Sequence, residues 1–135
     1  MDTIHPTVLL PKFDRNGLVP VIVQNKNTHQ ILMLAYANRA AYELTLKTGY
    51  AHFYSRSRQR LWKKGEESGN LMRVEDVWID CDGDALIYVV VPSGPACHTG
   101  KVTCFWRSVV GFCLDTKEGQ LQTEICEVCK AIAKA

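Results

Sequence analysis

Short runs of apolar residues, separated by polar residues that form turns, dominate the first half of the chain. The runs over residues 19–24 and 30–36 are rich in apolar and β-branched residues, which predicts two strands. The polar residues 25–29 between them predict a hairpin with a five-residue turn. A turn over residues 13–17 precedes the first strand, because its Asp, Asn and Gly residues tolerate tight backbone geometry.

A helix is predicted over residues 39–47, directly after this hairpin. Asn38 is a good N-cap, and Gly49 supplies the glycine that commonly follows the end of a helix. Three residues are expected to face inward, namely Ala41, Leu44 and Thr48. The helix is short, but both of its ends carry the expected residue types.

Strands are also predicted in much of the remaining chain, over residues 50–55, 72–79, 85–91 and 102–110. The run over residues 85–91 is continuously apolar, which indicates burial on both faces. The spacing of apolar residues over residues 121–135 predicts a final amphipathic helix. The expected fold is therefore α+β, with mostly antiparallel strands and a few short helices, in a single domain over residues 1–135.

Composition and charge support a soluble globular protein and exclude several other classes. Hydrophobic residues make up 47% of the 135-residue chain and charged residues 22%, which excludes a disordered or fibrous protein. The formal net charge of +2 gives no general case for binding nucleic acid or a membrane surface. The apolar run over residues 8–10 is too short for a secretion signal or a membrane span, so we expect a cytoplasmic protein.

The most basic part of the chain, residues 56–64, is a candidate anion site. Its cationic residues are Arg56, Arg58, Arg60, Lys63 and Lys64. In an extended backbone the three arginines would share one face, where guanidinium groups suit phosphate oxygens. A solvated charged loop is the alternative interpretation of such a run. Hydroxyl and backbone N–H groups also suit anions, and the segment offers them at Ser55, Ser57, Gly65 and Gly69.

Residues 80–104 carry two kinds of potential metal ligand. The hard ligands are Asp80, Asp82 and Asp84, whose carboxylates favour Mg²⁺ or Ca²⁺. The soft ligands are Cys81, Cys97 and Cys104, whose thiolates favour zinc. In an extended backbone Cys81 would point away from its aspartate neighbours, although Gly83 would relax this alternation by bending the chain. The segment therefore predicts two metal environments.

The thiols favour a zinc site that keeps one coordination position open. In a chain with no secretion signal, the six cysteines are better read as metal ligands, nucleophiles or core residues than as disulfides. Cys97 and Cys104 flank a glycine-containing segment, so a loop could bring both sulfurs to one ion. With Cys81 as third ligand, a tetrahedral zinc keeps one position for water, as catalytic sites do. His98, beside Cys97, is a candidate ligand or general base.

A competing set of cysteines lies near the C-terminus, at Cys113, Cys126 and Cys129. Cys126 and Cys129 form one half of a common zinc motif, but they lie one turn apart on the predicted helix with no second pair. A partly buried structural role is therefore the better interpretation, with a redox or adventitious metal pair as the alternative.

A series of short motifs follows in order between about residues 13 and 112. The series comprises Gly17-Leu18-Val19-Pro20-Val21-Ile22 with Gln24, Leu32-Met33-Leu34-Ala35-Tyr36 with Asn38, Ser55-Arg56-Ser57-Arg58, Leu61-Trp62 with Lys64-Gly65-Glu66, Ser68-Gly69-Asn70, Asp80-Cys81-Asp82-Gly83-Asp84, Ala96-Cys97-His98-Thr99-Gly100 and Cys104-Phe105. Together these motifs resemble the phosphoribosyl-AMP cyclohydrolase family of histidine biosynthesis. The resemblance is to the monofunctional form, because no pyrophosphohydrolase domain is expected after the last motif.

The resemblance implies hydrolytic opening of the adenine ring of 1-(5-phosphoribosyl)-AMP, between N1 and C6, to give ProFAR. It also implies Zn²⁺ and Mg²⁺ as cofactors and an intertwined homodimer with shared active sites. Zinc would be held by Cys97 and Cys104 of one subunit and by Cys81 of the partner subunit. Magnesium would be held by Asp80, Asp82 and Asp84.

The same resemblance suggests roles for other residues and leaves two alternatives open. His98 would move a proton, while Arg56, Arg58 and Lys64 would bind substrate phosphates. A zinc nucleobase or nucleoside deaminase attacks an equivalent purine carbon, but its His-x-Glu and Pro-Cys-x-x-Cys motifs are missing. A non-catalytic zinc-stabilised binding module would fit the cysteine count and the basic segment, but the chain lacks two Cys-x-x-Cys pairs at the usual spacing.

Overall fold

The computed structural model describes residues 8–110 of the chain. The chain divides into two compact units, Met1–Cys104 and Phe105–Ala135, and the elements described below all belong to the first. The helix predicted over residues 121–135 lies outside the described residues, as do Cys113, Cys126 and Cys129. Within residues 8–110, no helix is long and apolar enough to cross a membrane.

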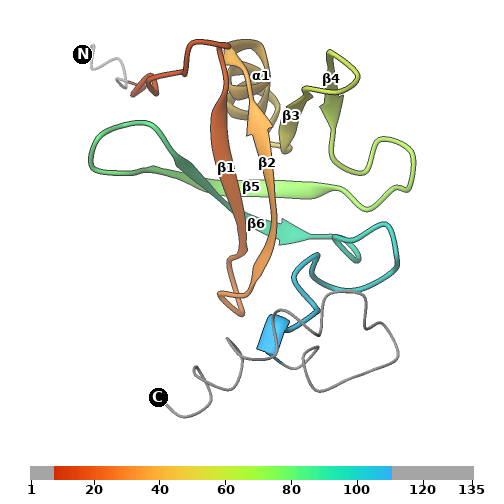
Figure 1. Cartoon of the computed structure of the whole chain (residues 1–135). Coiled ribbons are helices and arrows are strands. Elements are labelled where there is room, and N and C mark those ends of the chain that lie inside the picture. The colour runs from red at the N-terminus through yellow and green to blue at the C-terminus, as the bar shows by residue number, and fades with distance from the viewer. Residues whose placement is uncertain (1–7, 111–135) are drawn as a thin grey trace, which may run out of the picture. The chain divides into compact units, whose positions relative to one another are not determined.

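A four-stranded sheet forms the centre of the first unit (Figure 1). Its strands are β1 (Val19–Asn25), β2 (Ile31–Ala37), β5 (Met72–Ile79) and β6 (Leu86–Pro92), arranged in the order β2-β1-β6-β5. The β1–β2 and β5–β6 pairs are antiparallel, whereas β1 and β6 run parallel at the centre. The predicted hairpin is confirmed, and so is the mostly antiparallel α+β character of the fold.

Helix α1 (Arg39–Thr48) has the predicted ends. The Asn38 side chain accepts a 2.9 Å hydrogen bond from the Ala41 backbone N–H, and Gly49 ends the helix in the left-handed region at φ 81°. The predicted inner face is only partly right. The buried helix residues are Ala41, Tyr42 and Thr45, whereas Leu44 is half-buried and Thr48 is exposed.

A second, two-stranded sheet pairs β3 (His52–Ser55) with β4 (Arg60–Lys63) in antiparallel fashion. Strand β4 falls within the basic segment, where its cationic residues gave no strand signal. This hairpin packs on the main core through Phe53, whose ring centroid lies 4.9 Å from that of Trp62 and 5.7 Å from that of Tyr88 on β6. The core therefore joins the two sheets through aromatic side chains.

Two strand predictions differ from the structure. Strand β6 buries only one face, because Leu86, Tyr88 and Val90 are buried while the residues between them are half-buried. Within the described part of the second half, residues 102–110 form no strand. The Val102 carbonyl accepts from the Ala96 N–H and the Cys104 N–H donates to the Leu32 carbonyl, so this backbone bonds to separate partners rather than to one neighbouring strand.

Candidate active site

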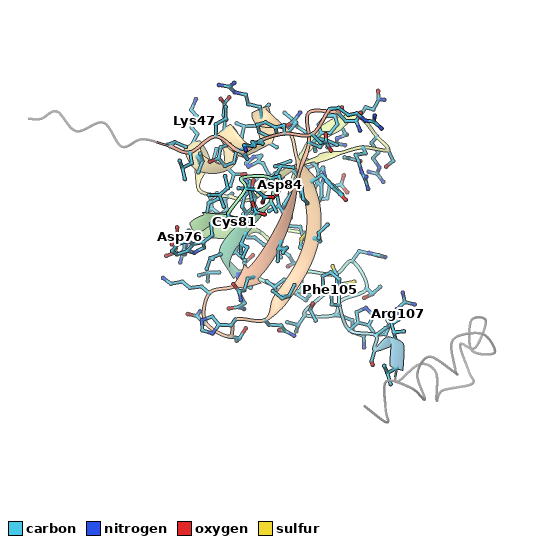
Figure 2. The ribbon with its side chains drawn as sticks, turned by 60° about the vertical axis from the view of Figure 1, so that its left-hand side comes forward. Lys47, Asp76, Cys81, Asp84, Phe105 and Arg107 are labelled. Carbon is cyan, nitrogen blue, oxygen red and sulfur yellow. The ribbon has the colours of Figure 1, made fainter. Side chains whose placement is uncertain are left out.

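The acidic segment forms a turn between β5 and β6. An Asp80 carboxylate oxygen accepts hydrogen bonds from the Asp84 N–H at 2.9 Å and the Ala85 N–H at 3.2 Å, while Gly83 adopts a φ of 80°. The bend at Gly83 that the sequence left open is therefore present, and the left-handed Gly83 folds the backbone back toward Asp80. Figure 2 labels Cys81 and Asp84 in this turn.

The turn gathers three exposed carboxylates, whose candidate ligand atoms all lie within 4.8 Å of one another. They belong to Asp80, Asp82 and Asp84. Hydrogen bonds with Asp80 and Asp82 and the charges of both carboxylates raise the pKa of Asp84 above its ordinary value. Although desolvation acts in the opposite direction, hydrogen bonds with Asp84 lower the pKa of Asp80. A divalent cation would relieve this crowding of negative charge, and the all-oxygen donor set fits a hard ion.

Residues 96–104 form a separate loop, here called the thiol loop. The Cys97 N–H donates to the Lys101 carbonyl at 3.1 Å, and the Gly100 N–H donates back to the Cys97 carbonyl at 2.9 Å. The Thr99 hydroxyl lies 3.0 Å from the Cys97 sulfur. These short-range bonds fold residues 97–101 into a tight turn that fixes the backbone at Cys97.

Thr103 fastens the end of the thiol loop to β2. Its buried hydroxyl donates to the Ile31 carbonyl at 2.7 Å and lies 3.2 Å from the Leu32 carbonyl. The Cys104 N–H donates to the same Leu32 carbonyl at 2.7 Å. Sequence reasoning missed Thr103, since a single buried hydroxyl has no pattern along the chain that would reveal its partner.

The two thiols of this loop are close neighbours. Burial raises the pKa of the Cys104 thiol, and so do the charge and a hydrogen bond of Cys97, while the charge of Lys64 acts in the opposite direction. A thiol pair in this arrangement fits a borderline metal such as zinc, which binds sulfur as thiolate. His98 follows Cys97 in the sequence and is exposed.

Cys81 does not join this pair within one chain. Among residues 8–110, the three aspartates are the only group of three His, Cys, Asp or Glu side chains whose potential ligand atoms all lie within 4.8 Å of one another. Cys81 lies in the turn before β6 and Cys97 in the loop after it, and the seven residues of β6 span about 20 Å. Cys104 is bonded to β2 at one edge of the sheet, whereas Cys81 follows β5 at the other edge.

A cavity of about 880 Å³ lies over the β3–β4 hairpin and is called the basic cavity here. Residues that line it include Tyr36, Arg56, Arg58, Arg60, Lys64 and Ser68. Its volume is within the usual range for pockets that enclose a small organic ligand. The cationic residues of this segment thus line one cavity.

The arginines reach the cavity through a turn rather than through an extended strand. Residues 56–59 connect β3 to β4, and the Arg58 N–H donates to the Ser55 hydroxyl at 3.2 Å. The Arg56 guanidinium carbon lies 4.1 Å from the centroid of the Tyr36 ring. Arg60 instead pairs with Glu66 at 2.6 Å, which leaves Arg56 and Arg58 as the better candidates for an anionic ligand.

Lys64 lies between the basic cavity and the thiol loop. Its side chain is half-buried, and its ammonium donates a 2.5 Å hydrogen bond to the Ala96 carbonyl. The residue before Cys97 is thus bonded to the segment that lines the basic cavity. No sequence pattern predicts this contact between Lys64 and Ala96, which are 32 residues apart.

Comparison with known proteins identifies the family. The sequence model described as phosphoribosyl-AMP cyclohydrolase matches residues 33–106, which include the basic cavity, the acidic turn and the thiol loop. The chain belongs to the phosphoribosyl-AMP cyclohydrolase family. The family resemblance inferred from the motifs is confirmed.

Several curated relatives are similar to this chain over most of its length. The phosphoribosyl-AMP cyclohydrolase of Methanospirillum hungatei is 58% identical over 105 residues, which cover 78% of this chain and 80% of the relative. The phosphoribosyl-AMP cyclohydrolase of Cenarchaeum symbiosum is 62% identical over 94 residues, which cover 70% of this chain and 87% of the relative. A bifunctional histidine biosynthesis protein of Thermus thermophilus is 58% identical over 99 residues, covering 73% of this chain but 46% of that protein.

Proposed function

We propose that this protein opens the adenine ring of 1-(5-phosphoribosyl)-AMP by hydrolysis between N1 and C6, giving ProFAR in histidine biosynthesis. The observation that carries the proposal is the family match over residues 33–106, which spans the thiol pair and the basic cavity together. The cavity volume of about 880 Å³ is suited to a small organic ligand, and its cations are suited to phosphates, which supports the proposal.

The proposed zinc ligands are Cys97 and Cys104 of one subunit and Cys81 of the partner subunit. The proximity of the first two thiols supports this set, and so does the position of Cys81 beyond their reach in one chain. When bound, zinc supplies a water whose pKa is near neutral. His98, exposed beside Cys97, is the proposed group that would accept or donate a proton during ring opening.

The proposed magnesium site consists of Asp80, Asp82 and Asp84, whose carboxylates converge in the acidic turn. Arg56 and Arg58 are proposed to bind substrate phosphates, because both line the basic cavity and Arg60 is already paired with Glu66. Lys64, the third cation expected at a phosphate, donates its hydrogen bond to the Ala96 carbonyl instead.

A homodimer with shared active sites is proposed as the working form. One face of the central sheet carries an apolar row that crosses all four strands, through the paired residues Leu34, Ile22, Ile87 and Trp78. Trp78 is 60% exposed and Leu34 47% exposed, which is unusual for large apolar side chains on one continuous face. A second copy of the chain would cover this row and bring its own Cys81. A solution mass equal to one chain at working concentration would contradict the dimer.

The proposed location is the cytoplasm, where thiols remain reduced and available to a metal.

An assay of purified protein with 1-(5-phosphoribosyl)-AMP tests the reaction. Ring opening retains the exocyclic nitrogen of the substrate, whereas a deaminase releases ammonia, so measuring ProFAR and ammonia together separates these two activities. We expect ProFAR without ammonia, loss of turnover in Cys104→Ser, and normal turnover in Lys47→Gln, which alters an exposed residue of α1. Zinc-loaded protein that binds the substrate and leaves it intact would support a binding module and contradict the enzyme.

A further inference from the structure

We propose that Lys64 is a positioning residue for the thiol loop and not a ligand of a substrate phosphate. The inference rests on the zinc site proposed at Cys97 and Cys104, and it adds a protein group that prepares these thiols for the metal. It starts from one contact, the hydrogen bond from the Lys64 ammonium to the Ala96 carbonyl.

Both ends of Lys64 are fixed by the fold. Its backbone N–H donates to the Ala51 carbonyl at 3.0 Å, which holds the main chain directly after β4. At the other end the ammonium lies 2.5 Å from the carbonyl of Ala96, a residue that is 1% exposed. A half-buried lysine that spans two segments in this way is not a freely mobile surface cation.

The segment before Cys97 is also packed against the loop that follows Lys64. The Ser93 N–H donates to the Leu71 carbonyl at 2.9 Å, and the Ser93 hydroxyl donates to the same carbonyl at 3.0 Å. A Cβ atom on Gly94 would lie 2.3 Å from the Asn70 side-chain oxygen, so a larger residue there would displace the Asn70 side chain. These contacts hold residues 93–94, and Lys64 holds the next part of the chain, immediately before Cys97.

The charge of Lys64 suits the same role. Zinc binds cysteine as thiolate, so metal binding at Cys97 and Cys104 places negative charge at two neighbouring sulfurs. The Lys64 ammonium, held at the Ala96 carbonyl, brings one positive charge to the loop that carries these thiols. Lys64 therefore combines a hydrogen bond that sets the loop geometry with a charge opposite in sign to that of bound thiolates.

Zinc affinity measured by chelator competition on metal-free protein tests this inference without relying on turnover. We expect Lys64→Met to weaken zinc binding by about 10–100-fold, the range typical of groups that support metal ligands. Lys64→Gln, which keeps a donor but no charge, should lie between Lys64→Met and the wild type. Lys63→Met is the matched control, because the Lys63 ammonium lies 4.9 Å from the Tyr50 ring centroid, and it should retain normal affinity.

Binding of AMP separates the two possible roles of Lys64. We expect Lys64→Met to bind AMP as the wild type does, and Arg58→Met to lose AMP affinity while its zinc affinity is unchanged. In Co²⁺-substituted protein, Lys64→Met should also change the thiolate-to-metal absorption bands, whereas Arg58→Met should not.

Two results would overturn the inference in distinguishable ways. Normal zinc affinity in Lys64→Met together with weakened AMP binding would make Lys64 a phosphate ligand and leave the zinc site intact. A wild-type protein that binds no zinc would contradict the proposed metal site and this inference with it. Thermal unfolding of each variant shows whether the fold is retained, and if Lys64→Met does not fold, Lys64→Gln decides between the two roles.

Discussion

The Thr103 hydroxyl donates a 2.7 Å hydrogen bond to the backbone carbonyl of Ile31, at the start of β2. Seventy-two residues separate the two positions in the chain. Because Cys104 follows directly and bonds to Leu32, this contact sets where the second thiol of the proposed metal site lies. A buried hydroxyl thus connects the stability of the sheet to the geometry of the site.

Replacing Thr103 tests this connection. Thr103→Val keeps the side-chain shape but removes the donor, so we expect the free energy of unfolding in urea to fall by about 1–3 kcal/mol. Zinc affinity should fall as well, because the residue before Cys104 loses its side-chain bond to β2. Thr48→Val is the control for loss of an exposed hydroxyl, because the Thr48 hydroxyl donates to the Leu44 carbonyl and accepts from the Tyr50 N–H, and it should lower stability by less than Thr103→Val does. A stable Thr103→Val protein with normal zinc affinity would show that the anchor is dispensable.

Tyr36 is predicted to orient Arg56 for substrate binding. The guanidinium lies over its ring at 4.1 Å, and a contact of this kind contributes about 0.5–1 kcal/mol at an exposed site. We therefore expect Tyr36→Leu to raise the KM for 1-(5-phosphoribosyl)-AMP by about 2–5-fold. Tyr36→Phe retains the ring and should behave like the wild type. Equal KM values in steady-state kinetics of Tyr36→Leu and Tyr36→Phe would remove the ring from substrate binding.

Glu66 should make stability depend on pH in the acidic range. Its pKa lies below the ordinary value of 4.5, because its side chain accepts from the Lys63 N–H and also interacts with Arg60. A lowered folded-state pKa means that the carboxylate contributes stability above pH 4.5, and this contribution disappears as the pH falls through the folded-state value. The urea midpoint of wild-type protein should therefore exceed that of Glu66→Gln at pH 7. The difference should shrink below pH 4.5, and a difference that is constant with pH would contradict this account.

Mixing two inactive variants tests the shared active site. Cys81→Ser and Cys104→Ser each damage every site in their own homodimers. After unfolding and refolding an equal mixture, half of the dimers are mixed and each has one intact site, so about a quarter of wild-type activity should return. Each variant refolded alone is the control and should stay inactive. If mass spectrometry shows mixed dimers but no activity returns, the thiols do not act across the subunit interface.

The sequence by itself determined the elements whose signals are local. The β1–β2 hairpin follows from two apolar runs around a polar turn, and α1 follows from Asn38 and Gly49 at its ends. Such features depend on backbone dihedral preferences and hydrogen bonds between near neighbours, which a short window of residues contains. The sequence also predicted which kind of metal each candidate ligand prefers, because carboxylates and thiolates differ in this preference wherever they lie in the fold.

Only the tertiary structure decided which of these residues meet. The sequence left open whether the acidic segment is extended or bent at Gly83, and in the structure a turn at Gly83 brings the three carboxylates together. Residues 102–110 carry a strand-like pattern, but the bonds of Val102 and Cys104 go to the thiol loop and to β2.

The contacts of Lys64, Arg60 and Thr103 also depend on the tertiary structure. Each of these side chains is bonded to a partner chosen by the packing of loops rather than by its spacing in the sequence. Residue types fix what a side chain is able to bind, because that property is carried by its own atoms. Its actual partner depends on which distant segments are brought together when the core is buried, and this outcome depends on the whole chain.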